Sequence, residues 1–460
     1  MRISDTTTPV VILKMEHYGS LGIVRSLGTL GIPVFGIDGN PSAPGFSSRY
    51  CAGRFLWDID EADPGRTVEY LFHVREVIGS NPILLPTSDE SAVLIADHEE
   101  VLSQSFIIPR RGSALVRSLC NKRTMHFLAC ESGIPTPRTE FPRNRENVRG
   151  YCESAMFPVM LKGIDGGRLE QRTGKKMVLA GNDKELLRYY DAMEDPDCPN
   201  LMLQEYIPGG EDSVWMFNGY FNEQSECMAG FTGRKLRQNP VYTGMTSLGV
   251  CLNNRAVADA TGKFMKAIGY RGILDIGYRY DSRDGNYKVL DVNPRIGATF
   301  RLFVGKKGLD VARACYLDMT GQPVPGDLAP EGRKWFVEDK DLVSSYRYYR
   351  DGKLSVMEWI ASYQGVQEAG YFEPRDLKPL YRAIVIDIRH RLKVLLAKFR
   401  RRTPLWKGRG KSSVQFGEQS QGQFIETGGR NSDLAIWKAA PSGQKGRKEG
   451  RHVVDVRGLQ

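Results

Sequence analysis

Apolar runs and helix-like stretches alternate over residues 1–115. Val10 to Leu13 is a short β-branched run, and a glycine-containing loop and a helical stretch separate it from a second apolar run that ends at Asp38. A further apolar run, 83–86, leads into Ser88, which we expect to cap a helix. Strands that alternate with helices in this way predict a parallel, doubly wound sheet. We therefore predict an α/β protein that begins with one Rossmann-like domain over residues 1–115.

The next stretch has one lysine at the start of a predicted helix and another at the end of a predicted strand. The helix begins at Asn121-Lys122, and the strand 157–162 ends at Lys162 and runs into a glycine-rich loop, 163–167. Backbone N–H groups and an ammonium group converge at such a junction, which suits a phosphate group. The alternative is a flexible surface loop beside a lysine whose charged end reaches solvent.

A predicted β-hairpin lies within residues 272–301. Two apolar-rich runs flank a Ser-Arg-Asp-Gly-Asn turn there. Because side chains alternate along a strand, Asp291, Asn293 and Arg295 project from one face, and Asp275 on the partner strand can face the same point. The oxygens suit Mg²⁺, and the guanidinium suits a phosphoryl group or a carboxylate. The alternative is an exposed hairpin followed by an Asn-Pro turn, and the hairpin alone does not decide between the two.

Two other stretches carry candidate ligand contacts. The strand 201–207 is followed by a Pro-Gly kink and by Glu211 and Asp212. An extended backbone can bond the edge of a purine there while a carboxylate takes a ribose hydroxyl. The stretch 231–249 contains Lys235, which can contact an anion, although a charged strand edge would have the same composition.

Taken in order, these parts resemble the ATP-grasp superfamily over residues 8–320, and within it the D-aspartate ligase group and related carboxylate–amine ligases. The resemblance implies that the Rossmann-like domain precedes an ATP-grasp domain of two α+β subdomains over residues 116–325. It rests on motifs in a fixed order along the chain, which are Asn121-Lys122, Gly133-Ile134-Pro135-Thr136-Pro137, Phe157-Pro158-Val159-Met160-Leu161-Lys162, Gln204-Glu205-Tyr206-Ile207-Pro208-Gly209 and Leu290-Asp291-Val292-Asn293-Pro294-Arg295.

The resemblance implies a nucleotide site. Lys122 and Lys162 match the two lysines that hold the phosphates of ATP, and Glu211 or Asp212 falls where an acid binds the ribose. Four residues match the hinge strand that meets adenine: Gln204, Glu205, Tyr206 and Ile207.

It also implies a metal and a catalytic group of residues. The residues that match ligands of Mg²⁺, which Mn²⁺ can replace, are Asp275, Asp291 and Asn293. The residues that match groups steadying the γ-phosphate or an acyl phosphate are Arg295, Lys235 and Arg301.

The implied activity is that of an ATP- and Mg²⁺-dependent ligase that joins a carboxylate substrate to an amine substrate through an acyl phosphate. An alternative within the superfamily is an enzyme like carbamoyl-phosphate synthetase or biotin carboxylase, in which the phosphoanhydride has a different acceptor. A second alternative is a non-catalytic sensor that keeps the ATP pocket. The sequence does not indicate the two substrates or an oligomeric state.

Composition agrees with a multidomain α/β protein. A chain of 460 residues has the length of about three domains. No apolar run reaches the roughly 18 residues that a membrane span needs, and the N-terminus lacks the apolar core of a signal peptide, so we expect a cytoplasmic protein. Eight scattered cysteines without a C-x-x-C pair argue against a zinc site or a disulfide framework.

The net charge of +10 is distributed unevenly. Residues 331–460 hold 26 Lys and Arg against 15 Asp and Glu, whereas residues 1–330 are close to neutral. Because the positive charge is confined to the C-terminal part, we do not expect a nucleic acid as the partner.

We predict that the C-terminal part forms a small helical extension over 326–402 and a tail over 403–460. We expect the tail to be disordered because it has few large apolar groups. Within the extension, residues 379–402 alternate apolar and basic side chains at helical spacing. Such a helix can make a peripheral contact with an anionic membrane, or it can dock its apolar face on the catalytic body. From the sequence we expect the second.

Overall fold

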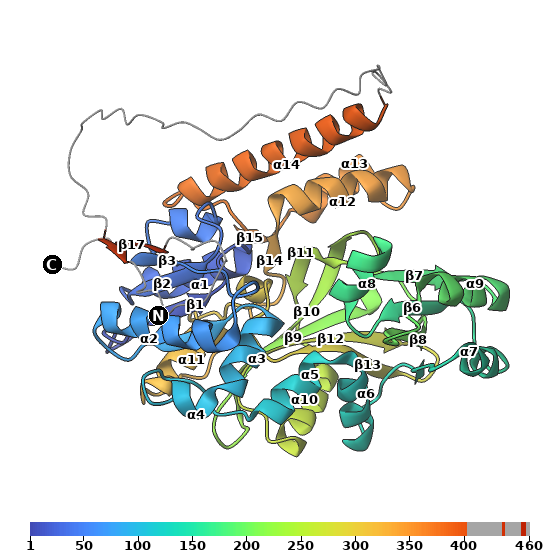
Figure 1. Ribbon diagram of the computed structural model, residues 1–460, viewed down its shortest axis with the longest axis horizontal. Helices are drawn as coiled ribbons and strands as arrows, with labels where there is room; N and C mark the ends of the chain where they lie inside the picture. The colour runs from blue at the N-terminus through green and yellow to red at the C-terminus, as the bar shows by residue number, and fades with distance from the viewer. Residues whose placement is uncertain (403–434, 438–451, 457–460) are drawn as a thin grey trace, which may run out of the picture.

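The structure is a computed structural model that describes residues 1–402, 435–437 and 452–456. In Figure 1 the N-terminal domain lies on the left, the strands and helices of the middle of the chain lie on the right, and helix α14 (Lys378–Arg402) runs along the top.

The N-terminal domain is built on a parallel sheet, as predicted. Its strands lie in the order β3-β2-β1-β4 and are β1 (Val10–Leu13), β2 (Val34–Asp38), β3 (Gly53–Leu56) and β4 (Ile83–Pro86). Its helices are α1 (Tyr18–Gly28), α2 (Pro64–Ile78), α3 (Asp89–Asp97) and α4 (Glu99–Leu102), with a short 3₁₀ turn η1 (Pro44–Ser47). Ser88 caps α3 by accepting the backbone N–H of Ser91, as its position predicts.

Two short strands from the end of the chain extend this sheet. β17 (His452–Val456) pairs antiparallel with β3, and β16 (Ala435–Trp437) pairs with β17. The remainder of the tail predicted to be disordered lies outside the described residues.

A four-stranded antiparallel sheet forms the next part. Its order is β5-β8-β6-β7, with strands β5 (Thr139–Glu140), β6 (Val159–Gly163), β7 (Met177–Ala180) and β8 (Leu201–Glu205). Its helices and the two that precede it are α5 (Ser113–Cys120), α6 (Lys122–Glu131), α7 (Arg145–Cys152), α8 (Gly166–Thr173) and α9 (Asp183–Met193).

The loop after β6 is shorter than the glycine-rich loop that the sequence predicts. Gly166 already opens α8, because the Asp165 carboxylate accepts the backbone N–H of Arg168 and caps that helix. Asn121 caps α6 in the same way and so places Lys122 in the first turn.

A seven-stranded sheet is the centre of the molecule. Its order is β13-β12-β9-β10-β11-β14-β15, and its strands are β9 (Val214–Phe221), β10 (Cys227–Asn239), β11 (Met245–Cys251), β12 (Gly272–Asp281), β13 (Asn286–Asn293), β14 (Lys334–Phe336) and β15 (Val366–Ala369). The associated helices are α10 (Arg255–Ala267) and α11 (Val311–Met319), with 3₁₀ turns η2 (Glu211–Ser213) and η3 (Phe300–Leu302). β12 and β13 are the two arms of the predicted hairpin.

The C-terminal extension is more than the helical appendage that the sequence predicts. β14 and β15 lie within it and add two strands to the central sheet, so this expectation was wrong. Its helices are α12 (Glu338–Arg350), α13 (Val356–Ser362) and α14.

The N-terminal domain, the central sheet and the extension share one hydrophobic core. Trp335 of β14 is 1% exposed, and its ring lies 5.5 Å from that of Tyr18 on α1. Gly19 permits a further close approach, because a Cβ there would lie 2.8 Å from the Cα of Ala298. The starts of α1 and of the loop after β13 are therefore fixed against each other.

We expect Trp335→Ala to lower the free energy of unfolding by about 3–5 kcal/mol, because it leaves a cavity in this shared core. Leu342→Ala removes a side chain that is 60% exposed and should change stability by less than about 0.5 kcal/mol. Denaturant unfolding followed by tryptophan fluorescence and by circular dichroism measures both variants. Equal effects of the two substitutions would contradict a shared core at Trp335.

Candidate active site

The hairpin of β12 and β13 places four residues on one face of the central sheet. Asp275 pairs with Asn293, and Gly277 pairs with Asp291, so all four positions project to the same side. Asn293 Nδ2 donates to Asp275 Oδ2 at 3.4 Å. Gly277 leaves open space beside Asp291, since a Cβ there would meet nothing within 4 Å. The predicted grouping of the two carboxylates and the amide is present.

Arg295 closes one side of this group. Its Nη2 donates to Asn293 Oδ1 at 3.1 Å, and its Nη1 lies 4.0 Å from Asp275 Oδ2. Its Nε donates at 2.8 Å to Asp89 Oδ1, which belongs to the first turn of α3 in the N-terminal domain. Asp89 directly follows the predicted helix cap Ser88, and 206 residues separate it from Arg295. The structure thus adds a carboxylate from another domain to the site.

Asp275 is held by a second residue that the sequence did not indicate. Asn218 of β9 lies opposite Asp275 in the sheet, and its Nδ2 donates to Asp275 Oδ1 at 2.8 Å. The Oδ1 of Asn218 is buried and has no hydrogen-bond partner among the described residues. Burial raises the pKa of Asp275, and the charge of Asp291 adds to this, while Arg295 and Asn218 oppose it. Two neighbouring carboxylates of this kind favour a cation between them.

Lys162 faces the acids from the four-stranded sheet. It lies at the end of β6 and is 9% exposed, and its ammonium group makes no hydrogen bond or ion pair with any described residue. Burial and the positive charge of Lys122 together lower the pKa of Lys162 to about 8, against the opposing effect of the negative charge of Asp291. A buried ammonium group without a protein anion in contact is suited to an anionic ligand.

Two more lysines lie near this point. Lys122 Nζ donates to the carbonyl of Ile164 at 3.2 Å, just before α8. Lys235 of β10 donates to the carbonyl of Gly244 at 3.1 Å. Burial lowers the pKa of Lys235, and the charges of Asp275 and Asp291 counteract that effect. The three lysines and the acids of the hairpin therefore line one cleft from different elements.

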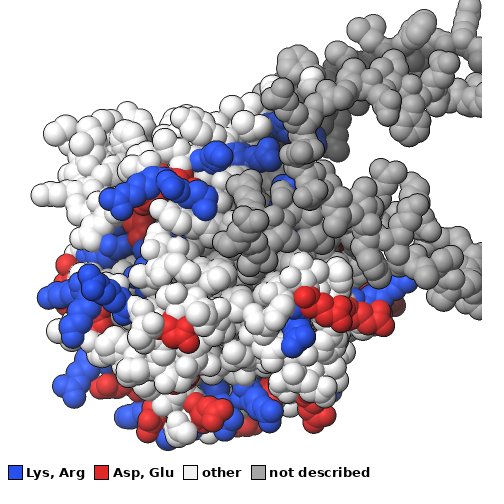
Figure 2. Space-filling model, turned by 90° about the vertical axis from the view of Figure 1, so that its left-hand side faces the viewer, with Lys and Arg blue, Asp and Glu red and all other residues white. Residues whose placement is uncertain are grey.

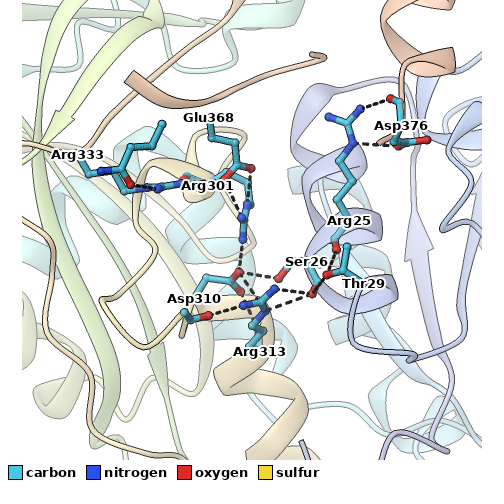
Figure 3. A network of polar contacts seen from close by, with 11 residues as sticks. Arg25, Ser26, Thr29, Arg301, Asp310, Arg313, Arg333, Glu368 and Asp376 are labelled. Atoms are coloured by element: carbon cyan, nitrogen blue, oxygen red, sulfur yellow. Dashed lines mark hydrogen bonds and ion pairs between the residues drawn. The ribbon is translucent and has the colours of Figure 1, made fainter. Parts of the chain in front are cut away.

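Arg301 lies elsewhere. Its Nη1 donates to Asp310 Oδ2 at 2.5 Å, and its Nε and Nη2 donate to the two carboxylate oxygens of Glu368 at 2.7 Å each, as Figure 3 shows. Glu368 also accepts Nη2 of Arg333 at 2.8 Å. Since all three guanidinium nitrogens are occupied by the protein, the structure does not bring Arg301 to the hairpin acids with Arg295 and Lys235.

The hinge strand β8 is held by its own side chains. Gln204 is buried, and its Nε2 donates to Thr139 Oγ1 at 3.0 Å. The Glu205 carboxylate accepts Nζ of Lys288 at 3.1 Å and Nη2 of Arg283 at 2.7 Å. This carboxylate therefore stabilises the hairpin turn. The main chain of β8 pairs with β5 and β6, and the backbone N–H groups of Glu205 and Tyr206 donate to the carbonyls of Arg138 and Pro158.

The chain after β8 turns sharply towards α12. Arg279 lies over the ring of Tyr206 at 5.2 Å and donates to the carbonyls of Ile207 and Gly209 at 2.8 and 2.7 Å. Glu211 and Asp212 then form the turn η2. Burial raises the pKa of Tyr348 on α12, and the Glu211 carboxylate adds to the effect, which places this acid beside the extension.

The donor set fits a divalent cation. The carboxylates of Asp275 and Asp291 and the amide oxygen of Asn293 are hard oxygen ligands on one face. Groups of three or more His, Cys, Asp or Glu that could hold a metal are absent from residues 1–402 and the other described segments. Two carboxylates are enough to bind Mg²⁺. This ion keeps several of its coordination positions for water and phosphate oxygens, so it does not need a site in which protein groups supply every ligand.

Comparisons with solved structures identify the fold. N5-carboxyaminoimidazole synthetase from Staphylococcus aureus in complex with ADP superposes with a TM-score of 0.55 at 14% sequence identity, over 71% of this chain and 80% of that chain. The biotin carboxylase domain of the Hydrogenobacter thermophilus 2-oxoglutarate carboxylase, with MgADP and bicarbonate, gives 0.55 at 15% identity over 72% and 74%. The chain has the ATP-grasp fold.

Two further comparisons bear on this ATP-grasp chain. The L-amino acid ligase from Bacillus licheniformis superposes with a TM-score of 0.53 at 13% identity, over 72% of this chain and 79% of that chain. By sequence, the D-aspartate ligase of Enterococcus faecium (strain Aus0004) is 28% identical over 243 residues. The match covers 50% of this chain and 57% of that ligase, so it spans little more than half the length of the curated relative. No protein-family model matches the chain.

We expect Lys162→Met to raise the free energy of unfolding at neutral pH. The pKa of Lys162 is lowered from 10.5 to about 8 in the folded state, so the buried charge costs on the order of 3 kcal/mol at pH values below 8. As the pH rises above 8 the native state releases the proton before the unfolded chain does, and the gain from the substitution should shrink.

Denaturant unfolding at neutral and at alkaline pH measures this difference. Lys175→Met, at an exposed position of the same subdomain, is the control and should leave stability unchanged at both pH values. A destabilising effect of Lys162→Met at neutral pH would show that Lys162 has a protein partner after all.

Proposed function

We propose that the protein is an ATP- and Mg²⁺-dependent ligase that joins a carboxylate to an amine through an acyl phosphate. The observation that carries the proposal is the buried, unpartnered Lys162 facing Asp291 across the ATP-grasp cleft. The sequence similarity to D-aspartate ligase supports the choice of this reaction over carboxylation.

In this proposal the cations of the cleft bind the phosphates of ATP. Lys162 and Lys122 approach from β6 and α6, and their mutual repulsion is relieved when a polyphosphate lies between them. The segment Gln204–Ile207 at the end of β8 would meet the adenine, and Glu211 or Asp212 would meet the ribose. Arg301 has no part in the site, because Glu368 and Asp310 already hold its guanidinium.

Asp275, Asp291 and Asn293 would hold Mg²⁺ or Mn²⁺, which neutralises phosphate charge when bound. Asn218 and Arg295 are positioning residues for this group, since they fix the Asp275 carboxylate and the Asn293 amide. Asp89 in turn orients Arg295 from the N-terminal domain.

The reaction needs little covalent help from the protein. A carboxylate oxygen attacks the γ-phosphorus of ATP, the bond to the β,γ-bridging oxygen breaks, and ADP leaves. The amine then attacks the acyl carbon of the mixed anhydride, inorganic phosphate leaves, and the nitrogen loses a proton. In this proposal Lys235 neutralises charge that develops on the transferred phosphoryl group, Arg295 holds the metal-binding amide, and positioning with charge neutralisation supplies the rate enhancement.

A phosphate-release assay with Mg-ATP over pairs of amino acids and small acids tests the reaction class. We expect phosphate release only with a particular acid together with a particular amine, and a new amide detectable by mass spectrometry. Lys162→Ala and Asp291→Asn should each lower turnover at least about a hundredfold, because each removes a charge that is needed at the phosphoryl group.

Lys175→Ala changes the charge by the same amount as Lys162→Ala at an exposed position, and it should keep full turnover. Release with an acid alone, or with bicarbonate, would point instead to carboxylation. Turnover that survives both site substitutions would remove the proposed active site.

The affinity for ADP should fall as the pH rises past about 8, because Lys162 loses its charge there in the free protein. Bound phosphate favours the charged lysine, so binding near this pH should take up a proton. Calorimetry in buffers of different ionisation enthalpy measures that uptake. The Lys162→Arg variant keeps its charge at all these pH values and should bind ADP without taking up a proton. A wild-type affinity for ADP that is constant with pH would contradict the role of Lys162.

A further inference from the structure

Helix α14 carries an apolar stripe that the protein leaves exposed. Six side chains at helical spacing form it and are between 40% and 63% exposed: Tyr381, Ile384, Val385, Ile388, Leu392 and Leu396. At 100° per residue they cover one side of the helix, whereas a helix that packs on a core turns such a stripe inward. The expectation that α14 docks its apolar face on the catalytic body was therefore wrong.

The first turn of α14 packs against the N-terminal domain. Pro379 is buried and Leu380 is half-buried, and this turn lies against η1 of the N-terminal domain. Beyond it the helix runs along the upper side of the molecule in Figure 1. The stripe begins where this packing ends.

Basic side chains border the stripe on both sides. Arg382, Arg389 and Lys393 follow one edge by helical geometry and are exposed, and Arg391 lies on the other edge. Asp387 pairs with Arg391 at 2.7 Å and is the one acid of α14. In Figure 2, basic side chains prevail on the upper part of the described surface, while acidic and basic side chains are mixed on the lower part.

A groove of about 380 Å³ continues the stripe at the start of the helix. Its walls are apolar and basic in turn, with Phe46 of η1 on one side and Lys378, Tyr381, Arg382 and Val385 of α14 on the other. Tyr381 and Val385 belong to both the groove and the stripe. The groove is of a size for a phosphate-bearing headgroup beside two cations.

We propose that α14 docks the protein on an anionic lipid bilayer. The stripe enters the boundary between headgroups and acyl chains, and the basic side chains on its edges meet lipid phosphates. A helix with one apolar side and basic edges lies in the plane of the interface. No helix in the described segments is both long and apolar enough to cross a bilayer. The proposal does not depend on the proposed ligase activity.

The charges on α14 disfavour a second copy of the chain as the partner that covers the stripe. Two α14 stripes packed on each other would bring the arginines and lysines of one edge close to those of the other copy. Asp387 is the one carboxylate within α14 that could offset them, and Arg391 already occupies it. An anionic bilayer offers the opposite charge along the whole helix.

Cosedimentation of the full chain with phosphatidylcholine vesicles, with and without phosphatidylglycerol, tests the proposal. We expect binding to the anionic vesicles alone, weakening as salt is added. Ile388→Ser with Leu392→Ser should reduce partitioning roughly tenfold or more, because both apolar contacts are lost. Arg389→Gln with Lys393→Gln should also reduce it roughly tenfold or more and flatten the salt dependence.

Lys184→Gln with Arg188→Gln is the matched control. Both residues are exposed on α9, and their loss changes the net charge by the same amount, so vesicle binding should be unaffected. All variants should keep the circular dichroism spectrum and ADP affinity of the parent, since none lies in the cleft.

Three results would overturn the proposal. The first is an absence of binding to anionic vesicles. The second is binding that the stripe variant retains in full. The third is a dimer in light scattering that the stripe variant converts to monomer without any lipid binding, which would assign the stripe to a second copy of the chain.

Discussion

The buried carboxylate of Asp310 joins the parts of the molecule that build the site. It is fully buried and accepts Ser26 Oγ of α1 at 2.6 Å and Nη1 of Arg301 at 2.5 Å, and through Arg301 it is linked to Glu368 on β15 (Figure 3). A buried charge that lost one of these partners would be strongly destabilising, so the three segments must keep one arrangement. Arg295 precedes Arg301 by one short loop. Its position between the hairpin and the N-terminal domain therefore depends on a network outside the cleft.

The protein distributes its buried charges in two ways. Arg301 and Glu205 are surrounded by opposite charges from the chain itself, and such pairs hold elements in register. Lys162 is equally buried but has no anion of the protein in contact with it. A bound anion would recover the free energy that this arrangement costs, and in the proposed function a polyphosphate supplies the missing charge. Whether the chain itself supplies the opposite charge therefore separates structural residues from candidate binding residues better than residue type does.

The sequence predicts the elements of the site but not its long-range pairings. The hairpin around Asp291 and the capped helix that begins at Lys122 depend on local signals, namely alternation, turn residues and a cap, and the structure has both. The contact between Arg295 and Asp89 joins residues 206 positions apart, and that between Arg301 and Glu368 joins residues 67 apart. Such contacts follow from how whole sheets pack, which periodicity does not record. For the same reason, the sequence did not predict the two strands that the extension adds to the central sheet.

The orientation of α14 is set by buried polar contacts rather than by a flexible linker. Asp376, two residues before the helix, is 4% exposed and pairs with Nε of Arg25 on α1 at 3.0 Å (Figure 3). It also accepts Ser48 Oγ at 2.7 Å, next to η1. Because α1 is in turn fixed to Asp310, the helix and the cleft belong to one framework. A surface that presents an apolar stripe at a defined angle to an active site can fix the direction in which that site faces, which a disordered basic segment cannot do.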